Sequence, residues 1–263
     1  MTKSQLTTGM EFSVGTSRWT QPAKVLSEEH GIPSLSFPGK ELDFITDKAI
    51  ALVKNHRYDL WDNTFVYVTA GLTNLTEKVT HGYGRRRYQE VLFYEESMTA
   101  VGRVFDSFVN SRDKILSHSI IPVYSTVAPM SFWDWNYSRL CQEKTTRLDH
   151  TEDYLVMQGD LEEAIIELNN KIREMNAQYS LLTPRIADYV FQKKGANDPH
   201  RFRHNRFVDG VHPDPDTVKA WTKEMLGTMS VNHVKINHDF YTAVHHPSQE
   251  FDLIDISDHE DSA

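Results

Sequence analysis

The chain has 263 residues, of which 39% are hydrophobic, and this is enough for one large domain or two small ones with a sizeable core. Its single cysteine, Cys141, excludes disulfides within the chain and disfavours a zinc–thiolate site. The net charge of −9 argues against phosphate binding by the whole surface. The sequence has neither the run of ~20 apolar residues that spans a membrane nor the apolar core of a secretory signal, so we expect an intracellular protein.

Extended and helical segments alternate along the chain. Residues 64–71 (TFVYVTAG) form the clearest buried strand, because they are β-branched or aromatic and end at a glycine. Apolar residues at helical spacing predict a helix over residues 160–176, with Asp160 as its N-cap. By the same criteria we expect further strands at 10–15, 32–39, 120–129 and 179–191, and further helices at 20–31, 40–56, 88–117 and 214–229.

Strands separated by helices predict an α/β fold with a parallel sheet and helices on both of its faces. The helical periodicity fades near residue 230. We therefore expect a domain at residues 1–230 and a C-terminal extension at 231–263, whose acidic end is disordered or binds a partner. In such sheets, ligands bind beyond the carboxyl ends of the strands. The residues that follow each predicted strand are therefore the first place to look for a site.

Chemistry-bearing residues follow the predicted strands in order. Each has an ordinary alternative as a helix cap or a turn residue. Together they supply what ester cleavage needs, namely a hydroxyl nucleophile, an imidazole base, a carboxylate that orients the base, and donors for the oxyanion. These residues are Ser17 as the nucleophile, Gly39 with Thr73 or Asn74 as oxyanion donors, Asp209 as the orienting carboxylate, and His212 as the base.

At this point the chain resembles the SGNH (GDSL-type) hydrolases. VGTS looks like their first block, FPGKEL like the second, YVTAGLTNL like the third, and VDGVHPD like the last, in which Asp and His are three residues apart. The resemblance covers roughly residues 10 to 228. It implies a three-layer α/β/α sandwich with a small parallel sheet, and a serine esterase or acyl hydrolase without a metal or cofactor. Small-molecule or glycan esters, acetyl esters among them, are the implied substrates.

The sequence departs from the family pattern in two blocks. Thr16 stands where the first block usually carries Asp. In the third block, aligning Gly71 with the family glycine puts Thr73 at the position of the oxyanion asparagine, whereas a shift of one residue would restore Asn74. The sequence leaves both donors open. A degraded oxyanion block favours an alternative, a binding module with weak or no catalysis, like the SGNH-like domains of viral or mobile-element polyproteins.

Substrate contacts are expected from three places near the strand ends. Arg18, directly after the serine, either meets an acidic substrate group or is solvated, and we favour a solvated side chain. Of the alternating Trp133 and Trp135, one could face a pocket; Trp133 is the residue assigned to the substrate. The run Arg85, Arg86 and Arg87 is either a solvated loop, which is the more common case, or an anion contact. In the second case Arg85 binds substrate, or all three arginines bind nucleic acid.

Two other site classes are disfavoured. The chain has 13 histidines but no HExxH pair, so we expect no metal site. The segment GTSRWTQP after the first strand is neither a GxGxxG nor a Walker sequence, which argues against nucleotide binding. The oligomeric state has no signature in the sequence.

Overall fold

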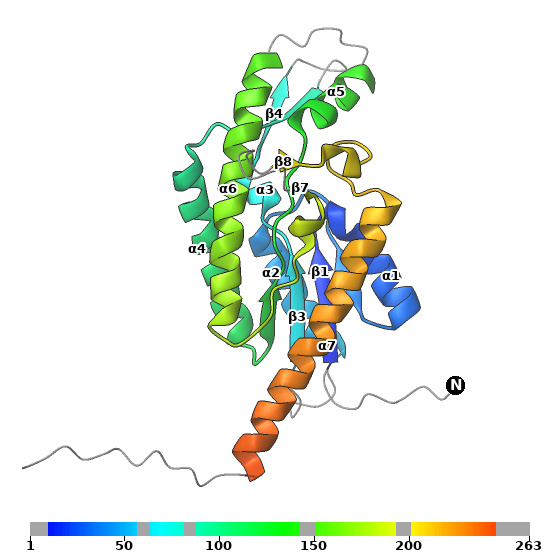
Figure 1. Ribbon diagram of the computed structural model, residues 1–263, viewed down its shortest axis with the longest axis vertical. Coiled ribbons are helices and arrows are strands. Elements are labelled where there is room, and N and C mark those ends of the chain that lie inside the picture. The colour runs from blue at the N-terminus through cyan, green and yellow to red at the C-terminus, as the bar shows by residue number, and fades with distance from the viewer. Residues whose placement is uncertain (1–9, 57–63, 82–87, 143–150, 193–200, 246–263) are drawn as a thin grey trace, which may run out of the picture.

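The computed structural model describes residues 10–56, 64–81, 88–142, 151–192 and 201–245. Its centre is a parallel sheet with the strand order β2-β1-β3-β6 (Figure 1). The central strand β3 is buried along its whole length, because its β-branched and aromatic residues face helices on both sides. The four strands are β1 (Met10–Gly15), β2 (Ser34–Ser36), β3 (Thr64–Thr69) and β6 (Ile121–Tyr124).

Helices cover both faces of the sheet, as the α/β prediction requires. The crossover from β1 to β2 runs in the opposite direction to those from β2 to β3 and from β3 to β6. Right-handed connections therefore put α1 on one face and α2 and α4 on the other. Helix α7 packs with α1, and α6 packs with α4 (Figure 1). The bounds are α1 (Thr20–His30), α2 (Leu42–His56), α4 (Ser97–Leu116), α6 (Thr151–Ala177) and α7 (Pro215–His245).

Beyond β6 the chain is irregular yet buried, from Ser125 to Ser131. Such a stretch needs partners for its backbone polar groups. Asn169 of α6 supplies them for Val127, accepting its N–H at 2.6 Å and donating to its carbonyl at 2.9 Å. The same two-way contact between a buried asparagine and one backbone residue recurs elsewhere: Asn136 with Val91, Asn176 with Tyr124, and Asn232 with Leu182. These contacts hold the loops around the sheet in place.

Two sequence expectations about helices are wrong. The helix expected from residue 88 begins at Ser97, because residues 88–92 form strand β5 (Tyr88–Leu92), which pairs antiparallel with β4 (Glu77–His81). Helix α6 begins at Thr151, so Asp160 lies within the helix and is not its N-cap.

The strand expected at residues 179–191 is also absent from the described sheet. Pro184 has no N–H to give to a strand ladder. Its carbonyl instead accepts the N–H of Thr126, and Thr126 Oγ1 accepts the N–H of Ala187. The segment contains a short 3₁₀ helix, η3 (Ile186–Tyr189), and then β7 (Phe191–Gln192), which pairs with β8 (Arg201–Phe202).

The remaining described elements are short and lie at the carboxyl edge of the sheet or beyond it. They are η1 (Ser17–Trp19), α3 (Leu72–Leu75), α5 (Phe132–Gln142) and η4 (His204–Arg206). At the C-terminal end, α7 continues through residue 230 without a break. The proposed division at that residue stays a prediction, and the acidic tail lies outside the described residues.

Candidate active site

Ser17 lies at the carboxyl edge of the sheet, directly after β1. Gly15 ends the strand, and a Cβ there would lie 2.5 Å from Trp19 Cβ, so only glycine lets the chain fold back this closely. The Thr16 N–H donates to the carbonyl of Thr69 on β3 at 3.1 Å. Trp19 is fully buried, and its indole N–H donates to Ser13 Oγ at 2.6 Å. Ser17 is therefore held between two anchored neighbours, and its side chain is half-buried.

Asp209 and His212 form a hydrogen-bonded pair in the loop before α7. The loop is pinned by the Val208 N–H, which donates to the His212 carbonyl at 2.8 Å. Asp209 Oδ1 accepts the N–H groups of Val211 at 3.1 Å and His212 at 2.8 Å, while Oδ2 lies 2.7 Å from His212 Nδ1. An ionised Asp209 accepts a hydrogen bond from the Nδ1–H group of His212, so Nδ1 keeps the ring proton and Nε2 is the free base of the ring.

The electrostatics of this loop favour an ionised carboxylate. Burial acts to raise the pKa of Asp209, but hydrogen bonds from the His212 side chain and backbone outweigh it and lower the pKa to about 2. Gly210 has φ +80° and packs so closely on α5 that a Cβ would lie 2.7 Å from the Ser131 carbonyl oxygen. This contact brings Trp135 beside His212, with ring centroids 5.9 Å apart.

One cavity of about 250 Å³ is lined by residues that follow all four strands of the sheet, β1, β2, β3 and β6. We call it the catalytic pocket. Among the residues that the structure describes, no hydrogen bond joins the Ser17 hydroxyl to His212, although both line this pocket. Such contacts commonly tighten only when substrate binds. The lining residues are Thr16, Ser17, Arg18, Pro38, Gly39, Leu72, Thr73, Thr76, Lys78, Val91, Met130, Trp135, Val211 and His212.

The two candidate oxyanion side chains lie in different places. Thr73 lines the catalytic pocket together with Gly39. Asn74 does not line it; its Oδ1 accepts the N–H of Leu42 at the start of α2, at 3.0 Å. Of the two side chains, only Thr73 lines the pocket that contains Ser17.

The fold of the chain matches that of solved structures over most of its length. A candidate acylhydrolase from Bacteroides fragilis covers 88% of this chain and 89% of its own, with a TM-score of 0.53 and 15% identity. A GDSL-like lipase from Bacteroides thetaiotaomicron covers 86% of this chain and 88% of its own, with a TM-score of 0.53 and 13% identity. The chain has the SGNH (GDSL-type) hydrolase fold. The three-layer α/β/α architecture expected from the sequence is thereby confirmed. No family model and no curated protein matches the sequence.

Within the SGNH fold, Arg18 is a buried residue, and the expectation of a solvated side chain is wrong. It is 5% exposed, its Nη1 donates to the Ala128 carbonyl at 2.5 Å, and its guanidinium lies 5.2 Å from the centre of the Phe207 ring. Burial lowers the pKa of Arg18 to about 9, while the carboxylate of Asp209 acts in the opposite direction. Its Nε and Nη2 have no hydrogen-bond partner among the described residues.

Of the two tryptophans considered for substrate binding, only one lines the catalytic pocket. Trp135 lines the catalytic pocket, whereas Trp133 is 42% exposed, lies outside the pocket lining and stacks on Tyr137.

Lys78 of β4 also lines the pocket and was missed by the sequence analysis, because the β4–β5 hairpin itself was not predicted. A Cβ on Gly39 would lie 2.8 Å from Lys78 Nζ. Arg85, Arg86 and Arg87, assigned to substrate or nucleic acid, lie outside the described residues.

Among the described residues, no group of three or more His, Cys, Asp or Glu side chains is arranged to hold a metal ion. No helix in the described part of the chain has both the length and the hydropathy needed to cross a bilayer.

Proposed function

We propose that the chain is a divergent SGNH serine hydrolase that cleaves a carboxylic ester. The observation that carries the proposal is the Asp209–His212 pair, held at 2.7 Å, in which His212 lines the same pocket as Ser17. A neutral serine needs a base to become a nucleophile, and the base needs a carboxylate to fix its tautomer and stabilise the cation. All three groups come from the carboxyl edge of the sheet, where folds of this class carry their chemistry.

The proposed reaction has two steps. Ser17 Oγ attacks the ester carbonyl while His212 Nε2 accepts its proton; the tetrahedral intermediate then expels the alcohol, which takes that proton from His212. A water molecule next attacks the acyl-enzyme, again with His212 as base, and releases the acid and free Ser17. The N–H groups of Ser17 and Gly39, with the Thr73 hydroxyl, are the proposed donors to the oxyanion. Small-molecule and glycan esters are the substrates to test.

The test is hydrolysis of p-nitrophenyl acetate by the wild type, Ser17→Ala and a matched Ser107→Ala control. Ser107 is half-buried on α4 and does not line the catalytic pocket. We expect Ser17→Ala to lose at least ~10³-fold in kcat and Ser107→Ala to match the wild type. A fluorophosphonate should label the wild type at Ser17 and leave Ser17→Ala unlabelled. Equal rates for the wild type and Ser17→Ala, or labelling at a different residue, would remove Ser17 from the mechanism.

A further inference from the structure

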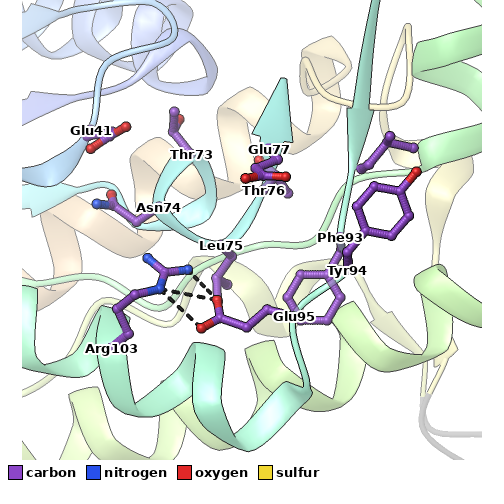
Figure 2. A pocket seen from close by; sticks show the side chains of 11 residues that line it. Glu41, Thr73, Asn74, Leu75, Thr76, Glu77, Phe93, Tyr94, Glu95 and Arg103 are labelled. Carbon is purple, nitrogen blue, oxygen red and sulfur yellow. Dashed lines mark hydrogen bonds and ion pairs between the residues drawn. The ribbon is translucent and has the colours of Figure 1, made fainter. Parts of the chain in front are cut away.

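A second cavity, of about 500 Å³, adjoins the catalytic pocket. It lies between α3, the start of α4 and the base of the β4–β5 hairpin (Figure 2). Thr73 and Thr76 line both cavities, so a substrate in the catalytic pocket could extend past Thr73 into this space. We call it the acidic cavity. It is lined by Glu41, Thr73, Asn74, Leu75, Thr76, Glu77, Leu92, Phe93, Tyr94, Glu95 and Arg103.

Carboxylates outnumber cations in the lining of the acidic cavity. Its one guanidinium, on Arg103, is held by Glu95, with Arg103 Nη2 2.6 Å from Glu95 Oε2. The dashed lines in Figure 2 mark this contact, and the carboxylates of Glu41 and Glu77 lie apart from it. Within the described residues, neither Glu41 nor Glu77 has an ion pair or a side-chain hydrogen bond. The cavity therefore carries two uncompensated negative charges.

Glu41, Glu77 and Arg103 all line this one cavity, so their charges act on a shared space. The hydrogen bonds that Arg103 donates to Glu95 are the main cause of the raised pKa of Arg103, and the charges of Glu41 and Glu77 raise it further. A cation placed in the cavity would feel the same carboxylates as Arg103 does. The exposed side chain of Tyr94 also lines the cavity, and aromatic rings attract alkylammonium groups.

The position of His212 decides which end of an ester enters the acidic cavity. The leaving alcohol must take its proton from His212, so the alcohol lies on the His212 side of Ser17. His212 and Trp135 line the catalytic pocket but not the acidic cavity. The acidic cavity adjoins the catalytic pocket at Thr73 and Thr76 and not at His212. Since the alcohol lies beside His212, we place the other end of the ester, its acyl chain, in the acidic cavity.

We propose that the acidic cavity binds a positively charged end of the acyl group, so that the enzyme prefers esters of cationic acids such as trimethylammonio-alkanoates. This inference rests on the proposed ester hydrolysis. The attraction involves partly solvated carboxylates, so it is moderate in size and screened by salt.

The kinetic test compares two substrates of one shape. They are p-nitrophenyl 4-(trimethylammonio)butanoate and p-nitrophenyl 5,5-dimethylhexanoate, in which a neutral carbon replaces the ammonium nitrogen. We expect kcat/KM for the cationic ester to be roughly 5- to 10-fold higher at low salt, with the ratio falling at 0.5 M salt as screening increases. Glu41→Gln/Glu77→Gln should bring the ratio close to one and leave p-nitrophenyl acetate hydrolysis unchanged. Glu28→Gln/Glu29→Gln on α1, outside the cavity, makes the same charge change and should keep the preference.

Further measurements distinguish an error in this inference from an error in the proposed ester hydrolysis. If p-nitrophenyl acetate is hydrolysed and Ser17 is labelled, but the substrate ratio is one, the acidic cavity has no role and the hydrolase stands. A charge preference seen only between acetylcholine and 3,3-dimethylbutyl acetate would overturn the acyl assignment. Calorimetry with Ser17→Ala needs no turnover: 4-(trimethylammonio)butanoate should bind more tightly than 5,5-dimethylhexanoate, and Glu41→Gln/Glu77→Gln should abolish the difference. Equal binding would refute the cavity's preference for a cation.

Discussion

Replacing Arg18 with methionine should leave the protein as stable as the wild type or make it more stable, although Arg18 is buried among many contacts. Burial lowers the pKa of this guanidinium to about 9. At about 1.4 kcal/mol per pKa unit, holding the charged group inside costs roughly 5 kcal/mol. Against this, the charged hydrogen bond to Ala128 contributes about 1.5–3 kcal/mol, and the contact with Phe207 contributes about 1–2 kcal/mol. Methionine keeps most of the volume and avoids both the burial cost and the two unpartnered nitrogens.

The expected change for Arg18→Met is therefore a gain of zero to about 2 kcal/mol in the free energy of unfolding, measured by urea denaturation at pH 7. Arg18→Lys is the matched control, because it keeps the charge but loses the reach to Ala128, and it should lose about 2–4 kcal/mol. Arg103→Met, at an exposed ion pair, should change stability by less than about 1 kcal/mol. A loss above about 2 kcal/mol for Arg18→Met would show that the buried charge is a net stabiliser, contrary to this reasoning.

Three further predictions concern the pocket and the sheet. Asp209→Asn should lower kcat for p-nitrophenyl acetate by roughly 10³-fold or more, because His212 loses its fixed tautomer, and unchanged turnover would contradict the proposed triad. Thr73→Val should lower kcat at least ~10-fold with little change in the free energy of unfolding. Asn74→Ala should keep most of kcat but lose about 1 kcal/mol of stability, because the N–H of Leu42 loses its acceptor. The reverse pattern would make Asn74 the oxyanion donor. Burial raises the pKa of Glu11 to about 7, so the fold holds a proton that the unfolded chain releases near pH 4, and stability is lost as the pH rises from there to 7. Glu11→Gln should therefore gain about 1–3 kcal/mol in urea denaturation at pH 8 and nothing at pH 4, and an equal gain at both pH values would refute the assignment.

The presence of the four central strands, and the residues that follow them, could be predicted because each signal is local. The segment at β3 is a continuous apolar run that ends at Gly71, and such a run is typical of a buried parallel strand. The loop at Asp209 contains its own partner three residues later, at His212, so the pairing could be inferred without knowing the fold. The sequence alone therefore indicates that the candidate site lies at the carboxyl edge of the sheet.

Features that depend on distant contacts could not be predicted. The strand character of residues 88–92 depends on pairing with β4, and without that partner the segment read as the start of a long helix. Buried asparagines such as Asn169 sit on helices where their polarity suggests a solvated face, yet they bind loop backbone far away in the sequence. Arg18 looked solvated for the same reason, because its contacts with Ala128 and Phe207 lie more than a hundred residues away.

Helix α7 determines where anything joined to the far end of the described chain would emerge. It begins at Pro215, three residues after His212, and runs to His245. At 1.5 Å per residue its length is about 45 Å, and Figure 1 shows its last turns projecting past the edge of the sheet at which β1 begins. The last residue of α7, His245, thus lies at the opposite pole of the molecule from the catalytic pocket. A fluorophore attached at that residue would leave the pocket open to solution.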